Sequence, residues 1–172
     1  MEETGIKNVR KMVMAGVLAA LTAICAWISI PIPPLAFTLQ TFAVLLSLGL
    51  LGGKWGTASI VIYLLLGMVG LPVFSGFQGS AALAGPTAGF LWGFVLGGLV
   101  YWDTEKLGIL WAMTGAQVTV YLCGCLWFSF YAGDIGFRAA ALTCVAPYLI
   151  PDGLKLLLAH SLTKRIGKSI RR

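Results

Sequence analysis

Residues 31–94 read PIPPLAFTLQTFAVLLSLGLLGGKWGTASIVIYLLLGMVGLPVFSGFQGSAALAGPTAGFLWGF, and the rest of the chain is organised around them. Two apolar segments are joined by a tight turn, GGKWG, at residues 52–56. A loop rich in Gly, Ser and Ala follows at 71–84, and the next apolar segment opens at Gly-Pro-Thr. Glycines let backbone groups approach a ligand, and apolar helices supply a lining. This pattern predicts a small-molecule pocket at one face of a membrane.

The composition of the whole chain indicates an integral membrane protein. Of the 172 residues, 59% are hydrophobic and 10% are charged, whereas a soluble domain has about 25% charged residues. The apolar runs are continuous rather than alternating, which favours helices over a transmembrane β-barrel. We therefore expect a single all-α membrane domain that covers residues 1–172.

The apolar runs predict six transmembrane helices. Pro31 ends the first run, and the glycines at 52–53 separate the second from the third. The polar turn at 102–106 separates the fourth from the fifth. The predicted spans cover residues 12–30, 38–51, 57–69, 86–101, 107–128 and 141–162.

The positive charges predict which side of the membrane the termini occupy. Six spans place both termini on one side with ten cations, whereas Arg138 alone lies on the other side and Lys155 lies within the sixth span. This asymmetry predicts that both termini are cytoplasmic. The net charge of +6 is then a topology signal that also attracts anionic lipid, rather than a sign of nucleic-acid binding. The ten cations are Lys7, Arg10, Lys11, Lys54, Lys106, Lys164, Arg165, Lys168, Arg171 and Arg172.

Catalytic, nucleotide-binding and metal sites find little support in the sequence. GGKWG lacks the spacing and the hydroxyl residue of a phosphate-binding loop, and His160 is the only histidine. The four cysteines lie in apolar runs, where small buried residues are the expected interpretation. We therefore expect no catalytic residue, no metal and no cofactor. The cysteines are Cys25, Cys123, Cys125 and Cys144.

Asp152 and Lys155 are the two clearly ionisable residues inside a predicted span. Such residues are costly in a bilayer, which makes them functional candidates. Their spacing of three puts them on one helix face. The pair either neutralises itself as a structural ion pair or faces a cavity. In a cavity, Lys155 would offer charge to an anionic ligand group and Asp152 would accept N–H hydrogen bonds. Pro151 suggests that the pair lies in the outer half of the span, where the loops at 31–37 and 71–85 also converge.

Polar amides and aromatic residues complete the candidate pocket. Gln40 in the second span and Gln78 in the loop could hydrogen-bond a neutral ligand, although a helix–helix bond and a solvated loop position are the alternatives. Gln117 is expected to form a hydrogen bond to a neighbouring helix. The aromatic residues that could form a wall, or else face lipid or core, are Phe74, Phe77, Phe90 and Trp92.

Small residues recur every four positions in the first span, at Ala15, Ala19 and Ala23. Such a stripe permits close approach of another helix. That helix could belong to this chain or to a separate partner.

The motifs PIPPLAFTLQTFAVLL, LLGGKWGTASIVIYLLLGMVGLPVFSG, GPTAGFLWGF and YLIPDGLKLLLA, in this order, resemble the BioY family over about residues 10–165. That family comprises the biotin-binding S components of energy-coupling factor (ECF) transporters. The resemblance implies a six-helix fold with an outward-facing biotin pocket and no catalysis. It also implies a bacterial cytoplasmic membrane, with a transmembrane T component and two ABC-type ATPases as partners.

The resemblance also implies roles for individual residues. Asp152 and Lys155 match the family's pair in the last helix, and Gln40 matches a glutamine of its second helix. The loop at 76–80, with Gln78 and Gly79, and Phe90 match pocket-forming positions. The stripe of Ala15, Ala19 and Ala23 resembles the motif that contacts the T component. An S component for another vitamin, and a structural membrane subunit without a ligand, are the alternatives.

Overall fold

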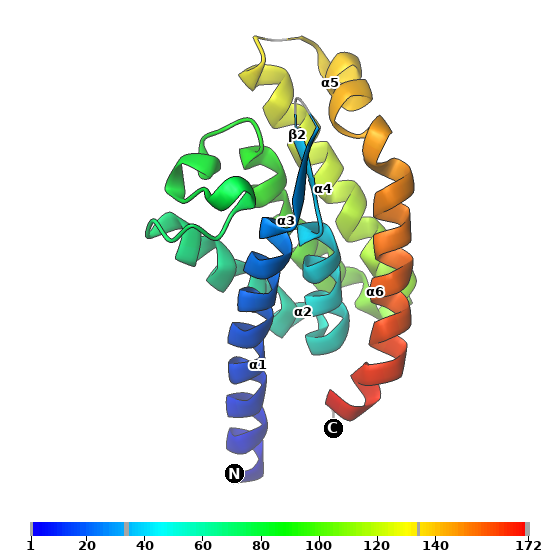
Figure 1. The fold of residues 1–172 in the computed structure, drawn as a ribbon. Helices are drawn as coiled ribbons and strands as arrows, with labels where there is room; N and C mark the ends of the chain where they lie inside the picture. Colours follow the sequence, from blue (N-terminus) through cyan, green and yellow to red (C-terminus); the bar gives the residue numbers. More distant parts are fainter. Residues whose placement is uncertain (1, 33–34, 134, 171–172) are drawn as a thin grey trace.

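The fold is that of a computed structural model, which describes residues 2–32, 35–133 and 135–170. It is mostly helical, as predicted, and a two-stranded β-hairpin near the N-terminus is the departure from an all-helical chain (Figure 1). The first element, α1, is followed directly by this hairpin. The helices are α1 (Glu2–Trp27), α2 (Gln40–Met68), α3 (Ala88–Thr104), α4 (Ile109–Tyr131), α5 (Phe137–Cys144) and α6 (Leu149–Ile170), and the strands are β1 (Ser29–Ile32) and β2 (Leu35–Thr38).

The helix α2 reverses direction at Gly52. This glycine has φ 80° and ψ 172°, a conformation that L side chains rarely adopt. The two legs, 40–51 and 53–68, pack antiparallel, because Gln40 Nε2 lies 3.0 Å from Tyr63 Oη and a Cβ on Gly56 would lie 2.6 Å from Leu48 Cα. The predicted break at 52–53 is therefore correct, but the second leg begins at once rather than at residue 57.

A carboxylate caps the second leg of α2. The backbone N–H of Gly53 donates to Glu105 Oε2 at 2.8 Å, and Glu105 begins the short 3-10 helix η3 (Glu105–Leu107). The side chain thus satisfies an N-terminal N–H and complements the helix dipole.

We expect Glu105→Ala to lower the free energy of unfolding by about 1 kcal/mol, the usual cost of a lost cap. Thermal unfolding in detergent measures this, with Asp103→Ala as the control because Asp103 is an exposed acid of the same turn. Equal melting temperatures for the two variants would contradict the capping role.

The helices α3 and α4 pack closely through three glycines of α3. Gly89, Gly93 and Gly97 recur every four residues along the interface. A Cβ on Gly93 would lie 3.1 Å from Val120 Cα, and one on Gly97 would lie 2.8 Å from Ala116 O. Small residues at this spacing let two backbones approach in a membrane. The close contact fixes the inner face of α4 against α3.

The predicted first and sixth spans differ from the helices observed. The first helix ends at Trp27, and β1 and β2 follow as the hairpin, in which Ser29 pairs with Thr38 and Ile32 with Leu35. The predicted span 141–162 is not one helix, because the 3-10 helix η4 (Ala146–Tyr148) separates α5 from α6. Pro147 contributes to this break, since it has no N–H for a helical bond.

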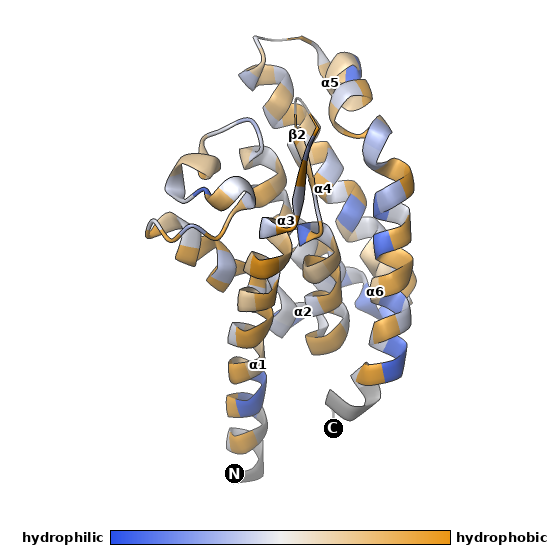
Figure 2. Ribbon diagram, in the orientation of Figure 1, coloured by the Kyte–Doolittle hydropathy of each residue, from blue (hydrophilic) through white to orange (hydrophobic). Residues whose placement is uncertain are grey.

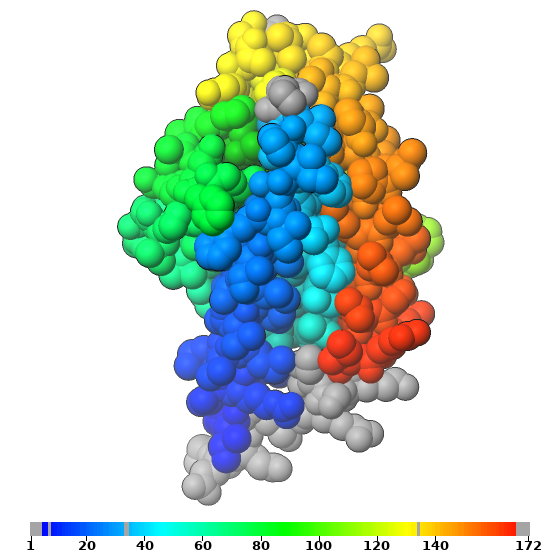
Figure 3. All heavy atoms as spheres, viewed as in Figure 1, coloured from blue at the N-terminus to red at the C-terminus, as the bar shows by residue number. Residues whose placement is uncertain are grey.

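Within the described residues, four helical segments are long and apolar enough to cross a membrane. Apolar residues colour most of α1, whereas α6 carries both apolar and polar residues (Figure 2). The start of α1 and the end of α6 lie at one end of the molecule, and α5 and the hairpin lie toward the other (Figure 1). In the space-filling view, the hairpin lies between the loop that follows α2 and the α5–α6 region (Figure 3). The four segments are Asn8–Trp27, Gln40–Met68, Ile109–Tyr131 and Phe137–Gly167.

Candidate binding site

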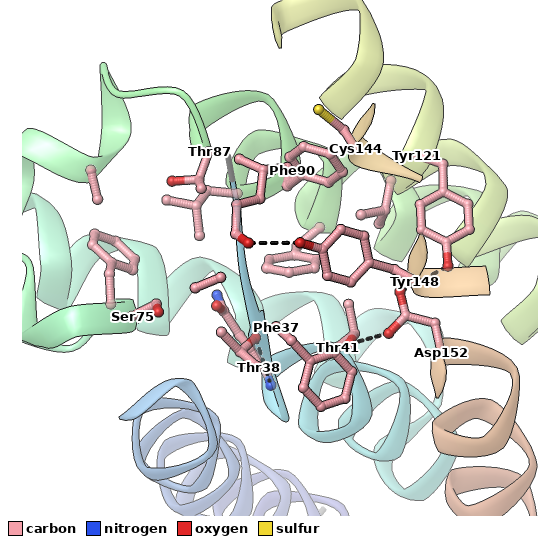
Figure 4. A pocket seen from close by; sticks show the side chains of 18 of the residues that line it. Phe37, Thr38, Thr41, Ser75, Thr87, Phe90, Tyr121, Cys144, Tyr148 and Asp152 are labelled. Atoms are coloured by element: carbon pink, nitrogen blue, oxygen red, sulfur yellow. Dashed lines mark hydrogen bonds between the residues drawn. The ribbon is translucent and has the colours of Figure 1, made fainter. Parts of the chain in front are cut away.

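A cavity of about 250 Å³ lies in the half of the molecule that carries the hairpin. Strand β2, the first turn of α2, the loop at 70–87 and the inner faces of α3, α4 and α6 all line it (Figure 4). Its volume approaches the lower end of small-molecule sites, about 300 Å³. The predicted pocket between the glycine-rich loop and apolar helices is therefore present in the structure.

Asp152 and Lys155 line this cavity as a buried ion pair on α6. Lys155 Nζ lies 2.7 Å from Asp152 Oδ1. Lys155 is 5% exposed and Asp152 is 7% exposed. The ammonium group also lies 3.8 Å from the centre of the Phe37 ring. Desolvated cation–π contacts of this kind are favourable. Both of the interpretations considered for the pair thus hold at once: it is neutralised internally, and it faces the cavity.

Three neighbouring residues complete the bonding of the pair. Lys155 Nζ donates to Thr38 O at 2.5 Å and to Thr41 Oγ1 at 3.2 Å, and Tyr121 Oη donates to Asp152 Oδ2 at 2.8 Å. Tyr121 and Thr41 both point toward Asp152 (Figure 4). The three ammonium N–H groups of Lys155 therefore have protein partners. A ligand carboxylate could contact Lys155 only by displacing one of them.

The cavity has a buried polar end and a more accessible one. Asp152 lies at one side of the close view and Ser75 of the glycine-rich loop at the other (Figure 4). Ser75 is half-buried and Gln78 is exposed. Between the two ends, Phe90, Leu91 and other apolar side chains form the wall.

Six of the seven predicted substrate-binding residues line this one cavity. The seventh, Gly79, does not. A Cβ on Gly79 would lie 2.9 Å from Gly70 O, so this glycine allows the middle of the loop to approach its start. The six are Gln40, Phe74, Gln78, Phe90, Asp152 and Lys155.

Gln40 also forms the helix–helix hydrogen bond considered as its alternative. Its Nε2 donates to Tyr63 Oη, and Tyr63 Oη donates to Val73 O at 3.1 Å. This chain of bonds connects the two legs of α2 to the start of the loop. The amide oxygen of Gln40 has no bond to another described residue, which leaves an acceptor at the cavity wall.

Two of the four candidate aromatic residues lie outside the cavity lining. Phe77 is 64% exposed and stacks on Trp27 with ring centres 5.4 Å apart. Trp92 Nε1 donates to Leu83 O at 3.4 Å. Both therefore hold the loop from outside, whereas Phe74 and Phe90 form part of the wall.

The alanine stripe of α1 faces the interior of this chain, so its prediction as a partner contact is not supported. Ala15 and Ala19 are 0% exposed and Ala23 is 6% exposed, within a core that α1 shares with α2. A residue fully covered by its own chain has no surface left for another protein. Gly16 and Val17, on the other face of α1, are exposed.

Sequence reasoning missed Thr38, Thr41, Tyr121 and Tyr148 as cavity residues. Tyr148 Oη donates to Leu35 O at 2.6 Å and so fixes the hairpin to η4. One signal was available for Tyr121, since it follows Gln117 by one helical turn in an otherwise apolar segment. The other three become neighbours only through the hairpin and the break at η4.

Comparisons with known proteins place the chain in a family. The family model described as the BioY family matches residues 1–172. The biotin transporter BioY of Thermotoga maritima is 39% identical over 165 residues, which cover 92% of this chain and 96% of that protein. The probable biotin transporter BioY of Pyrococcus horikoshii is 35% identical over 159 residues, which cover 91% and 96% of the two chains.

A solved structure has a similar fold. It is the crystal structure of the S-component for biotin from an ECF-type ABC transporter, with a TM-score of 0.85. The sequences are 24% identical, and the match covers 94% of this chain and 92% of that one.

Proposed function

Because this chain belongs to the BioY family, we propose that it binds biotin as the substrate-binding (S) component of an uptake transporter and is not an enzyme. The observation that carries the proposal is the cavity with a buried ion pair, bonded by the protein, at one end and an accessible polar loop at the other. Biotin likewise has two different polar ends, a ureido ring and a carboxylate, which are joined by an apolar middle.

The bonding of Lys155 sets the proposed direction of the ligand. An anion at Lys155 would compete with Asp152, Thr41 and Thr38, which already occupy its donors. A neutral ureido group fits this ion pair better than an anion does, because its N–H groups can donate hydrogen bonds to the carboxylate of Asp152. The ligand carboxylate then lies toward Ser75 and Gln78 at the accessible end, where solvation costs less.

The proposed contacts follow from this direction. Asp152 receives ureido N–H groups, and Lys155 keeps that carboxylate charged and oriented. Gln40 offers its free amide oxygen, Phe74 and Phe90 contact the apolar middle, and Gln78 lies near the carboxylate. Gly79 acts through the shape of the loop.

We also propose six membrane crossings with both termini cytoplasmic. The antiparallel legs of α2 count as two crossings, and α5 with α6 counts as one that is interrupted at η4. Lys54 and Lys106 lie near the turns that follow the first leg of α2 and α3. The excess of cations on the side of the termini supports the orientation. A bacterial cytoplasmic membrane is the proposed location.

Partner proteins supply the energy in this proposal. The proposed partners are a transmembrane T component and two ABC-type ATPase subunits, and the structurally similar S-component comes from an ECF-type ABC transporter. The sequence itself has no phosphate-binding loop motif, so ATP hydrolysis by that route belongs to the partners.

Binding of labelled biotin, riboflavin and thiamine to the purified full chain tests the function. We expect saturable binding of biotin alone, with a melting temperature that rises with biotin concentration because the ligand stabilises the folded state. Preference for another vitamin would make this an S component of different specificity. No stabilisation by any of the three would favour a structural subunit instead.

A further inference from the structure

Gln117 of α4 is a buried polar residue that the proposed contacts leave unused. It lines the cavity and is 6% exposed. Its Nε2 atom is buried and has no hydrogen-bond partner within the described part of the chain. Tyr121 lies one helical turn further along and is close to Gln117, but Nε2 forms no hydrogen bond to its hydroxyl that meets the geometric criteria. The Tyr121 hydroxyl itself donates to Asp152.

An unbonded amide N–H group inside a protein is costly, and such groups usually have a partner. If Gln117 formed a hydrogen bond between helices, Nε2 would need an acceptor on another helix, and the described residues offer none. The cavity is the remaining place from which an acceptor could approach Nε2.

We propose that Gln117 Nε2 donates a hydrogen bond to the carbonyl oxygen of the ligand's cyclic urea, an inference that rests on the biotin-binding function proposed above. Gln117 and Asp152 both lie beside Tyr121, since Gln117 precedes it by one turn and Asp152 accepts its hydroxyl at 2.8 Å. One end of the cavity therefore presents an amide donor next to a carboxylate acceptor.

A cyclic urea has the complementary pattern. Its carbonyl oxygen accepts and lies between two N–H groups that donate. Asp152 Oδ2 has one protein donor, Tyr121, and an ionised carboxylate oxygen can accept a second. Gln117 then donates to the carbonyl oxygen, and Asp152 accepts from an adjacent N–H group. The two residues together select a cyclic urea over rings that lack a carbonyl group beside an N–H group. Gln117 becomes a specificity-determining residue of the site.

The test compares biotin with 2-iminobiotin, in which a C=NH group replaces the ring C=O and protonates to a guanidinium at neutral pH. We expect Gln117→Met to lower biotin affinity at least tenfold without lowering the melting temperature of the ligand-free protein, because Nε2 has no hydrogen-bond partner in the described part of the chain. We expect Gln117→Glu to reverse the preference, because a carboxylate accepts from the guanidinium. The control is Thr114→Val, an exposed position of α4, which should change neither property.

Two results would overturn the assignment. One is wild-type biotin affinity in Gln117→Met. The other is a lower melting temperature of ligand-free Gln117→Met together with an unchanged ratio of the two affinities in Gln117→Glu, which would indicate a contact between helices. In both cases the wild-type chain still binds biotin and the proposed function stands. Failure of the wild-type chain to bind biotin would instead remove the function and this inference together.

Discussion

Lys155→Ala is expected to weaken biotin binding by about 10–100-fold, the loss associated with a charge-assisted hydrogen bond at a buried site. Lys155 bonds to Asp152, Thr41 and Thr38 at the closed end of the cavity. Without the ammonium group, Asp152 loses its counter-charge and the first turn of α2 loses its connection to α6. Equilibrium binding of labelled biotin to the purified variant measures the change.

A double variant separates the role in binding from the role in folding. Removal of one partner of a buried pair costs about 3–5 kcal/mol of stability, whereas replacement of both is often neutral. We therefore expect Lys155→Met alone to lower the melting temperature, and the combination with Asp152→Asn to restore it while biotin binding stays weak. Unchanged affinity in a folded Lys155→Ala protein would remove Lys155 from the site.

Ala19→Trp is expected to prevent stable folding and, with it, biotin binding. Ala19 is 0% exposed in the core that α1 shares with α2. Even a few added methylene groups in a packed core cost about 1–3 kcal/mol, and an indole ring is much larger. The yield of monodisperse protein and its biotin binding measure the effect.

Val17→Trp is the matched control, because Val17 lies on the same helix and is 63% exposed. We expect this variant to fold and to bind biotin like the wild type. A folded, biotin-binding Ala19→Trp protein would show that the alanine stripe is open to a partner, contrary to the packing seen in the structure.

Much of the fold could be predicted from local sequence. The apolar runs predicted a helical membrane chain, and the glycines at 52–53 predicted the reversal of α2, because only glycine readily adopts the positive φ found at Gly52. The hairpin could not be predicted in the same way. Residues 29–38 are apolar and rich in proline, and the hairpin that they contribute to is bonded by Tyr148, which is more than a hundred positions away.

The residues of the candidate site likewise fall into those that the sequence predicts and those that it does not. Asp152, Lys155 and Gln40 were predicted because polar groups in apolar spans are costly and therefore conspicuous. Thr41 and Thr38 were not, since a threonine is common in membrane helices and only its distance to Lys155 reveals its role. The direction of the α1 stripe was also undetermined, because helical periodicity shows that residues share a face but not what that face contacts.

The sequence by itself determined that this chain crosses a membrane, where its helices break, and that one opposite-charge pair shares a helix face, because hydropathy, backbone restrictions and helical spacing are local properties. Only the tertiary structure decided that Lys155 is fully bonded by the protein, that Gln117 has a free donor in the cavity and that Ala19 is buried in the core of its own chain. Those facts depend on distances between segments far apart in the chain, which packing sets and no local pattern records.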